Sequence, residues 1–190
     1  MLKKTLVINE NISSYENYYF NYNLDFLTKF NIHNYYAKTF CKKISLNFGF
    51  KEIKFEKKQM ILYFFLLELL TNQKCSLTFS KKNLINLKIK KGAVVGCKVT
   101  LTNKNLYNFL DLIMLSLPRS EIFKGFLLKK NTLKKNTYST QLKNLFVFYP
   151  LESDIINTVK TLDLTFKFNS LSDLDKSFFF TFYKIPMNSI

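Results

Sequence analysis

Two separated segments of this chain alternate apolar and polar residues position by position. In the first segment, Ile44, Leu46, Phe48 and Phe50 alternate with Ser45, Asn47 and Gly49. In the second segment, the apolar residues of one face are Val95, Cys97, Val99 and Leu101. A period of two is the pattern of a half-buried strand, in which every second side chain lies on the same side of a sheet. These segments therefore predict strands of a sheet that is covered on one side.

Other segments place apolar residues at steps of three and four, as helices that cover such a sheet do. The clearest of them extends from Asn105 to Leu117 and ends at Pro118, which cannot continue a helix. Ser172 and Asp175 resemble a capping box that begins a last helix. This last helix is expected to continue to Phe182. Further helices are expected over Tyr18–Phe30 and Phe55–Thr71, and further strands over Cys75–Phe79, Leu145–Tyr149 and Leu162–Phe168. The polar segment Lys124–Lys143 is expected to be irregular.

The chain shows neither an internal repeat nor a linker rich in Pro, Gly or Ser, so the expected elements share one core. With 190 residues, of which 47% are hydrophobic, it has the size of a single domain. We predict an α+β fold with a mixed, mainly antiparallel sheet, helices packed on one side and a protruding basic loop. Residues 1–17 are expected to form an N-terminal extension, and residues 18–190 the folded domain.

The charge of the chain points to a polyanionic partner. Lys and Arg total 29 against 13 Asp and Glu, which gives a formal net charge of +16. Such a field attracts nucleic acid or an anionic membrane. Arg119 is the only arginine, and Trp is absent while Phe, Tyr, Asn, Ile and Lys are abundant, a bias that indicates A+T-rich coding. This bias explains the many aromatic residues without any stacking on bases.

Most of the unbalanced charge lies in two stretches that contain no acidic residue. Between Glu68 and Asp111 lie Lys74, Lys81, Lys82, Lys88, Lys90, Lys91, Lys98 and Lys104, and between Ile122 and Leu151 lie Lys124, Lys129, Lys130, Lys134, Lys135 and Lys143. A solvated surface is the usual reason for such runs. Phosphate binding is favoured here because so much charge is unbalanced, and because each neutralised phosphate releases condensed counterions.

Three further residues are candidate contacts to RNA. Arg119 carries a planar guanidinium that can bind phosphate in a bidentate manner, and an ion pair with Glu121 is the alternative interpretation. Asn47 can contact base edges or 2′-hydroxyl groups through its amide. Phe48 can stack on a splayed base, although packing in the core agrees at least as well with its place in the alternation.

No group of residues indicates catalysis or metal binding. His33 is the only histidine, and neither a cysteine nor an acid near it in sequence would orient it as a general base. Cys41, Cys75 and Cys97 are odd in number and show no CxxC spacing, so neither a zinc site nor a disulfide framework is indicated. We therefore expect no enzymatic activity, no cofactor and no metal, and a reducing compartment.

The segment Met60–Leu70 is the only one that resembles a membrane span. It has about half of the ~20 apolar residues that a spanning helix needs and it contains Glu68, so a core helix without membrane insertion is expected. The N-terminal residues contain Glu10 and Glu16 and no arginine, unlike a transit peptide. If the protein works in an organelle, we expect it to be made there.

The segment from Phe79 to Phe126 resembles a family of ribosomal proteins. It reads FSKKNLINLKIKKGAVVGCKVTLTNKNLYNFLDLIMLSLPRSEIFKGF. Large-subunit ribosomal protein five has a basic loop of the type KxxxxFKIRxGxPIG, a strand GCKVTLRG and a turn of the type PRxRDFRG, which correspond here to Lys82–Gly96, Gly96–Asn103 and Pro118–Gly125. The segment KKISLNFGF at Lys42–Phe50 is similar to the family's KITLNMGVG, Tyr149-Pro150 to its FPE, and Leu162-Asp163-Leu164 to its GLDI. Gly49, Gly92, Gly96 and Gly125 fall on glycine positions of the family, and we expect each to mark a place where a side chain would interfere.

The resemblance covers about residues 18–187 and implies a structural RNA-binding protein of the large ribosomal subunit. The A+T-rich composition suggests a mitochondrial genome, so we expect the protein to be encoded in the mitochondrion and to work in the mitochondrial ribosome. In the family, the sheet and the 118–125 turn hold 5S rRNA and large-subunit rRNA in the central protuberance. The 80–92 loop reaches the tRNA in the peptidyl site, and the body contacts a head protein of the small subunit and neighbouring large-subunit proteins. The implied rRNA contacts are Asn47, Phe48, Lys98, Arg119 and Lys124, and the implied tRNA contacts are Lys81, Lys82, Lys88, Lys90 and Lys91.

Two other functions agree with the residues taken alone. One is an unrelated basic RNA-binding protein of an organelle. The other is a peripheral membrane protein that uses Met60–Leu70.

Overall fold

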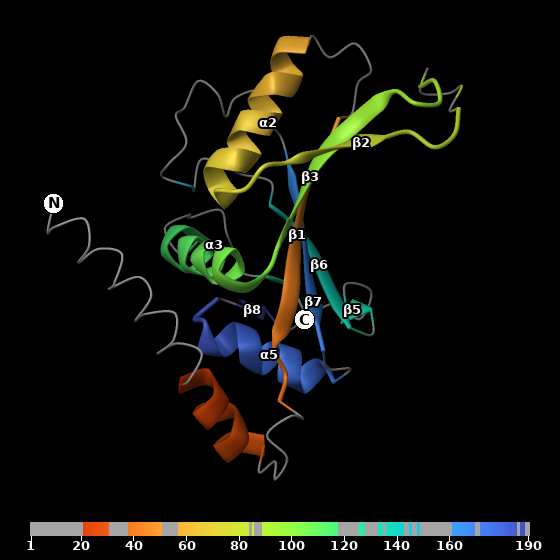
Figure 1. Ribbon diagram of the computed structural model, residues 1–190. Coiled ribbons are helices and arrows are strands. Elements are labelled where there is room, and N and C mark those ends of the chain that lie inside the picture. The colour runs from red at the N-terminus through yellow and green to blue at the C-terminus, as the bar shows by residue number, and fades with distance from the viewer. Residues whose placement is uncertain are drawn as a thin grey trace, which may run out of the picture.

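Figure 1 shows the chain as a computed structural model. The structure describes residues 21–30, 38–50, 57–83, 85, 89–117, 126–127, 133–134, 136–142, 145, 148, 161–169, 172–185 and 187–188. The expected extension over residues 1–17 lies outside the described residues.

Strands from distant parts of the chain form one sheet. Its six strands are β1 (Cys41–Gly49), β2 (Ser76–Phe79), β3 (Val94–Leu101), β5 (Leu133–Lys134), β6 (Thr137–Leu142) and β7 (Leu162–Phe168), in the order β2-β3-β1-β7-β6-β5. Every neighbouring pair in this sheet is antiparallel. The short strands β4 (Phe126–Leu127) and β8 (Met187–Asn188) form a separate parallel pair. The expected mainly antiparallel arrangement is therefore confirmed.

Helices cover one side of this sheet only. Helices α2 (Lys57–Thr71), α3 (Asn103–Ser116) and α5 (Asp173–Phe182) lie on the same side (Figure 1). The helix over residues 21–30 packs against α5, where the ring centroids of Tyr22 and Phe182 are 5.1 Å apart. In the described part of the chain, the other side of the sheet carries no helix. The predicted α+β fold is thus confirmed.

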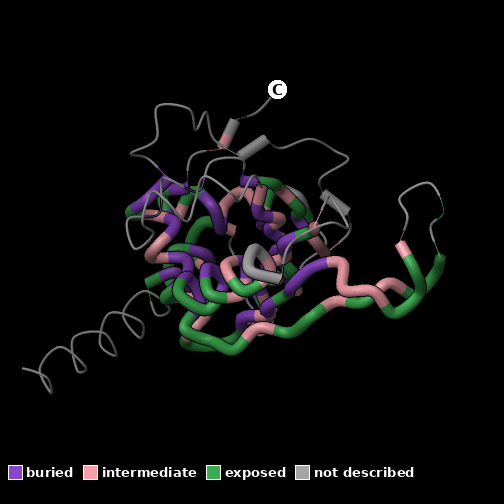
Figure 2. The backbone as a smooth tube through the Cα atoms, turned by 90° about the horizontal axis from the view of Figure 1, so that it is seen from above, coloured by how far each residue is buried: buried purple, intermediate pink, exposed green. Residues whose placement is uncertain are grey.

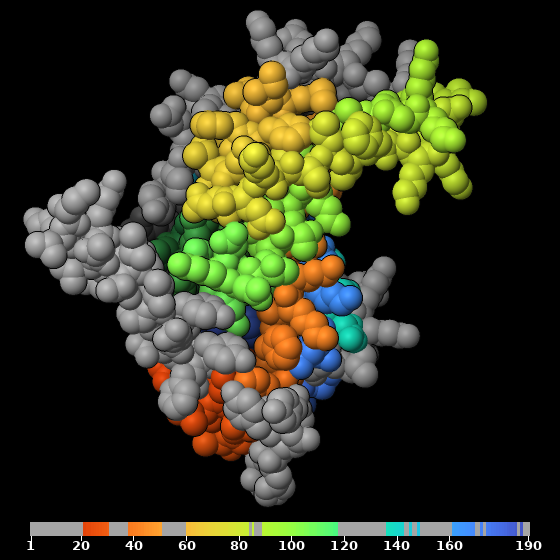
Figure 3. Space-filling view, viewed as in Figure 1, coloured from red at the N-terminus to blue at the C-terminus, as the bar shows by residue number. Residues whose placement is uncertain are grey.

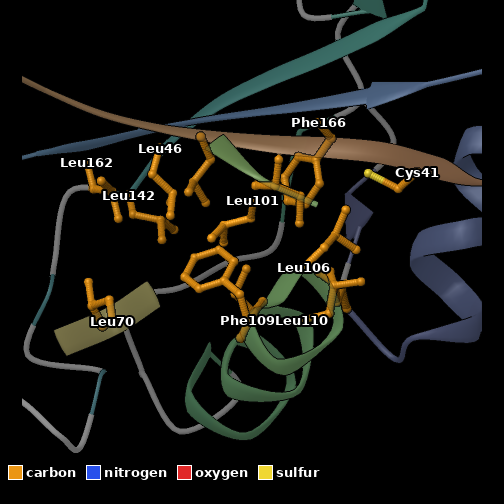
Figure 4. Packing of buried hydrophobic residues seen from close by; sticks show 14 of the residues in the cluster. Cys41, Leu46, Leu70, Leu101, Leu106, Phe109, Leu110, Leu142, Leu162 and Phe166 are labelled. Atoms are coloured by element: carbon orange, nitrogen blue, oxygen red, sulfur yellow. The ribbon is translucent and has the colours of Figure 1, made fainter. Parts of the chain in front are cut away.

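The core lies between the sheet and its helices. On β1, Ile44 is paired with Leu101 of β3 and with Phe166 of β7, and these three side chains are fully buried. Figure 4 shows Phe109 and other residues of α3 pointing toward the strands from below. Fully burying an apolar side chain of this size contributes about 1.5–3 kcal/mol.

Helix α5 supplies an aromatic part of the core. Phe180 is fully buried, and its ring contacts Phe166 edge to face at a centroid distance of 5.2 Å and Tyr138 at 5.1 Å. The helix begins as the sequence predicts, because the Ser172 hydroxyl accepts a hydrogen bond from the Asp175 amide at 3.3 Å. This bond satisfies one of the free amides of the first turn.

Helix α2 confirms the expected helix over its described residues, but only one of its faces is buried. Tyr63, Leu66, Leu67 and Leu70 lie in the core, whereas Ile61, Phe65 and Leu69 follow one another at steps of four and are exposed. The core interpretation of this segment therefore holds for one face. No helix among the described residues is long and apolar enough to cross a membrane.

Two predictions about secondary structure are wrong. The segment Lys124–Lys143 contains β4, β5 and β6, although its sequence predicts an irregular structure. Its strand character comes from tertiary pairing, since β6 pairs with β7 along its whole length and places Tyr138 and Leu142 in the core. Conversely, Leu145 and Phe148 are buried but belong to no strand, and the Phe148 amide donates to the Leu145 carbonyl at 3.1 Å. The other residues of the expected strand Leu145–Tyr149 lie outside the described residues.

The glycine positions differ in whether a side chain would fit there. A Cβ added at Gly96 would meet the carbonyl oxygen of Phe48, and Gly92 has a φ of 84°, which favours glycine. An added Cβ at Gly49 would meet nothing within 4 Å, so the expectation that a side chain interferes there is wrong. Gly125 lies outside the described residues.

Candidate nucleic-acid interface

The side of the sheet that carries no described helix has a polar surface, which we call the open face. Strand pairing places its residues in register between the core positions. They are Ser76 and Thr78 of β2, Gly96, Lys98 and Thr100 of β3, Lys43, Ser45, Asn47 and Gly49 of β1, Asp163, Thr165 and Lys167 of β7, and Thr137, Ser139 and Gln141 of β6. Each is a glycine, a hydroxyl, an amide or a charged residue. An apolar partner would find no complementary side chain among them.

Three lysines give the open face its positive charge. Lys43 and Lys167 are directly opposite each other on β1 and β7, and Lys98 on β3 is opposite Asn47. Like charges directly opposite on neighbouring strands destabilise a sheet. An anion placed between Lys43 and Lys167 would remove this repulsion, so the pair is suited to a phosphate group.

The middle of the open face carries a negative charge and hydrogen-bond acceptors instead of lysines. The Asp163 carboxylate accepts a hydrogen bond from Gln141 Nε2 at 2.8 Å and a longer one from Asn47 Nδ2 at 3.5 Å. These bonds occupy donors of the two amides and leave their carbonyl oxygens as acceptors. This acceptor-rich group would repel phosphate and favour donors such as 2′-hydroxyl groups or base amino groups.

The sequence predicts Asn47 as an RNA contact but does not point to its two partners in this group. Leu162, Leu164 and Phe166 are core residues, so the alternation along β7 places Asp163 on the polar face. That alternation was a usable signal for Asp163. Gln141 lies in the segment whose sequence predicts an irregular structure, and no pattern in the sequence pairs it with Asp163.

Hydrogen bonds also order the edge of the open face near β2. The Ser76 hydroxyl donates to the Lys98 carbonyl at 2.9 Å, and Gln73 Nε2 donates to the Thr100 carbonyl at 3.2 Å. Both bonds join the start of the hairpin to β3. The position of Lys98 is therefore fixed by main-chain contacts on two sides, since β1 pairs with the other edge of β3.

Strands β2 and β3 continue beyond the sheet as a projecting hairpin, which we call the arm together with its loop over residues 80–92. Figures 1 and 3 show the arm extending away from the body, and Figure 2 shows that its surface is mainly exposed. The ladder continues into the loop, because the Ser80 amide donates to the Ala93 carbonyl and the Gly92 amide to the Ser80 carbonyl, each at 2.9 Å. Asn83 Oδ1 accepts from the Lys91 amide at 2.6 Å. The sequence-predicted protruding loop is thus an ordered extension of the sheet in its described residues.

The loop lysines that the structure describes are exposed. Lys81, Lys82, Lys90 and Lys91 have no acidic partner among the described residues, and Ile85 near the tip is 89% exposed. Lys88 lies outside the described residues. The arm therefore presents positive charge at a distance from the open face.

Phe48, Arg119 and Lys124 are the remaining predicted rRNA contacts. Phe48 is fully buried, and its ring contacts Tyr63 of α2 edge to face at 5.3 Å. The proposed stacking of Phe48 on a base is therefore wrong, because its place on β1 points the ring into the core. Arg119 and Lys124 lie outside the described residues, so their contacts to rRNA stay predictions.

Several core residues have shifted pKa values. Burial raises the pKa of Cys41 and Tyr138 to about 12, and it raises the pKa of Tyr22 and Tyr183 as well. These groups stay neutral at physiological pH. Among the described residues, no group of three or more His, Cys, Asp or Glu side chains could hold a metal ion.

Comparisons with known proteins agree with this architecture. The model of the C-terminus of the ribosomal L5 protein family matches residues 94–187. The large ribosomal subunit protein uL5m of Reclinomonas americana is 34% identical over 168 residues, which are 87% of this chain and 92% of that protein. The uL5 protein of Wolbachia pipientis subsp. Culex pipiens is 33% identical over 83% of this chain and 89% of its own length. That of Wigglesworthia glossinidia brevipalpis is 34% identical over 76% of this chain and 82% of its own length.

Proposed function

Because this chain belongs to the ribosomal L5 family, whose members are structural and non-enzymatic proteins of the large ribosomal subunit, we propose that its open face binds rRNA. The observation that carries this proposal is the composition of that face, which combines three lysines with a central group of acceptors. Phosphate contacts would position the protein, and the acceptor group would contact 2′-hydroxyl groups or base edges. Because the chain belongs to this family, the alternative of an unrelated basic RNA-binding protein is excluded.

The affinity of an Asp163 variant for rRNA distinguishes this proposal from binding by general charge attraction. We expect Asp163→Ala to weaken binding to a transcript of the cognate large-subunit rRNA by about tenfold, because an acceptor and the anchor of two amides are lost, a change of about 1–1.5 kcal/mol. General attraction predicts the opposite sign, since the variant is more positive than the parent.

Asp25 supplies the matched control for that experiment. It is exposed on the helix over residues 21–30, away from the open face, so Asp25→Ala makes the same change of charge elsewhere. We expect Asp25→Ala to bind as tightly as the parent or slightly more tightly in a filter-binding titration. Tighter binding by Asp163→Ala would show that the carboxylate does not contact the RNA.

We further propose that the rRNA includes 5S rRNA in the central protuberance and that the ribosome is mitochondrial. The A+T-rich coding bias and the similarity to uL5m of Reclinomonas americana support the mitochondrial matrix as the location. Arg119 and Lys124 belong to the same proposed rRNA interface by the family resemblance. The body of the protein would also contact a head protein of the small subunit and neighbouring large-subunit proteins.

The arm is proposed to contact the tRNA in the peptidyl site. Its exposed lysines would meet the tRNA backbone without reading its sequence, as any tRNA must be accepted. We expect that replacing residues 82–90 by a short Gly/Ser turn leaves melting temperature and large-subunit incorporation nearly unchanged, because loops vary without disturbing the core. The same variant should release peptidyl-site tRNA faster.

A charge-only variant is the control for this change in length. Replacing Lys82, Lys90 and Lys91 by glutamine keeps the loop and removes its phosphate contacts, and it should also release tRNA faster. If incorporation fails while the isolated protein still folds, the arm is an rRNA anchor. Unchanged tRNA dissociation in both variants would contradict the tRNA contact.

A further inference from the structure

Helix α2 is apolar on the side that faces away from the sheet as well as on the side that packs against it. Ile61, Phe65 and Leu69 follow one another at steps of four and are 66%, 49% and 39% exposed. Such steps place them side by side along the helix, and we call them the α2 stripe. A helix that is apolar on all sides is ordinarily buried on all sides. The stripe is therefore a surface that the described part of the chain leaves uncovered.

The A+T-rich coding bias does not account for this stripe. The bias acts on the whole chain, yet the exposed side of α3 carries Asn103, Lys104 and Asn108. The open face is polar in the same way. Exposed apolar residues that stand singly are normal on a protein surface, whereas a contiguous group of them marks a contact. The α2 stripe is such a group.

The charge beside the stripe shows which partner would fit it. From Met60 to Thr71 the helix contains no lysine, and Glu68 is its only charged residue, in a chain with a net charge of +16. Glu68 is exposed and lies three positions after Phe65, so it flanks the stripe. Its Oε1 accepts from the Cys75 amide at 3.2 Å, which holds the carboxylate in place. This surface repels phosphate and is complementary to apolar residues that are flanked by a cation.

We propose that the α2 stripe binds a second protein of the large ribosomal subunit, through an apolar segment of that protein flanked by a lysine that pairs with Glu68. Membership of a family of large-subunit proteins supplies such neighbours. Proteins that bind rRNA carry lysines for its phosphates, so the complementary cation is available. The stripe lies on the helix side of the sheet, so RNA on the open face leaves it accessible (Figure 1). The inference does not depend on the open face binding rRNA.

The size of the stripe argues against a second copy of this chain as the partner. Three partly exposed side chains offer on the order of 250 Å² of apolar surface. A stable interface between free proteins needs about 800 Å² from each partner. The stripe is therefore the apolar part of a contact that forms inside an assembled particle, where both proteins are already held at a high effective concentration.

The first test uses intact purified large subunits that contain the full chain. A carbodiimide couples a carboxylate to a lysine amine in direct contact with it. We expect a cross-linked peptide that joins Glu68 to a lysine of another large-subunit protein, with apolar residues next to that lysine. Hydroxyl-radical oxidation of Phe65 and Leu69 should also be slower in the subunits than in the free protein, because the partner covers both side chains.

The second test compares Phe65→Gln with Leu174→Gln, which removes a leucine of α5 that is 75% exposed. Both changes are at the surface, so both variants should melt as the parent does and bind protein-free rRNA as tightly. Salt weakens phosphate contacts but not apolar ones. After a high-salt wash of large subunits, we expect the retained amount of Phe65→Gln to fall about tenfold, as for an aromatic anchor of an interface. Leu174→Gln should be retained as the parent is.

Three results would overturn the proposal. Equal oxidation rates of Phe65 and Leu69 in the free protein and in the subunits would show that the stripe stays uncovered. A photoreactive benzophenone side chain at position 65 that attaches to rRNA in the subunits would show that RNA covers it. Protection of the stripe in the free protein that rises with its concentration would identify a second copy as the partner.

Discussion

Raising monovalent salt from about 50 to about 200 mM is expected to weaken rRNA binding by about 100- to 500-fold, if the protein covers about four or five phosphates. The reason is the release of condensed counterions from each phosphate that a lysine neutralises. The open face supplies Lys43, Lys98 and Lys167, and the family resemblance adds Arg119 and Lys124 to the same proposed interface. The chain has 29 Lys and Arg against 13 Asp and Glu, so most of its cations have no acid to pair with. Titrations at a series of salt concentrations measure the slope directly.

Single lysine variants show which surface carries that dependence. We expect Lys98→Ala and Lys167→Ala each to reduce the slope of log affinity against log salt by about 0.9 or less. Lys104 is exposed in the first turn of α3, on the side of the sheet that carries the helices, so Lys104→Ala should leave the slope unchanged. Equal slopes for all three variants would place the rRNA on another surface.

Gly96→Ala is expected to destabilise the fold by about 1–3 kcal/mol, as overpacking of a close-packed site does. An added Cβ would meet the carbonyl oxygen of Phe48, which is main chain and cannot rotate away, and it would lie 3.1 Å from Thr78 Oγ1. β3 is paired on both sides, so relief of this contact requires a shift of β1 or β2. The corresponding loss of melting temperature is about 2–12 °C for a chain of this size.

Gly49→Ala is the matched control, because Gly49 is directly opposite Gly96 on β1. An added Cβ there meets nothing within 4 Å, and the residue is exposed. We expect its free energy of unfolding to change by less than about 0.5 kcal/mol. Equal melting temperatures for the two variants, measured by circular dichroism, would show that the contact with Phe48 is relieved without cost.

The sequence by itself determined which residues face the core and which face away. Alternation along β1 and β3 depends only on the strand period, so it placed Ile44, Leu46 and Val99 in the core without knowledge of any partner. The helical periods did the same for α3, and the Ser172 cap marked the start of α5. The positive charge and the protruding loop were likewise readable, since both are local properties of the chain.

Only the tertiary structure decided which strands are neighbours. A period of two gives a face but no partner, so the contact of Asp163 with Asn47 and Gln141 appears only when β7 lies between β1 and β6. Tertiary structure also decided that β6 is a strand. Its local sequence pattern is weak, and it is a strand because it pairs with β7. These contacts join residues that are distant in sequence, and no local pattern specifies them.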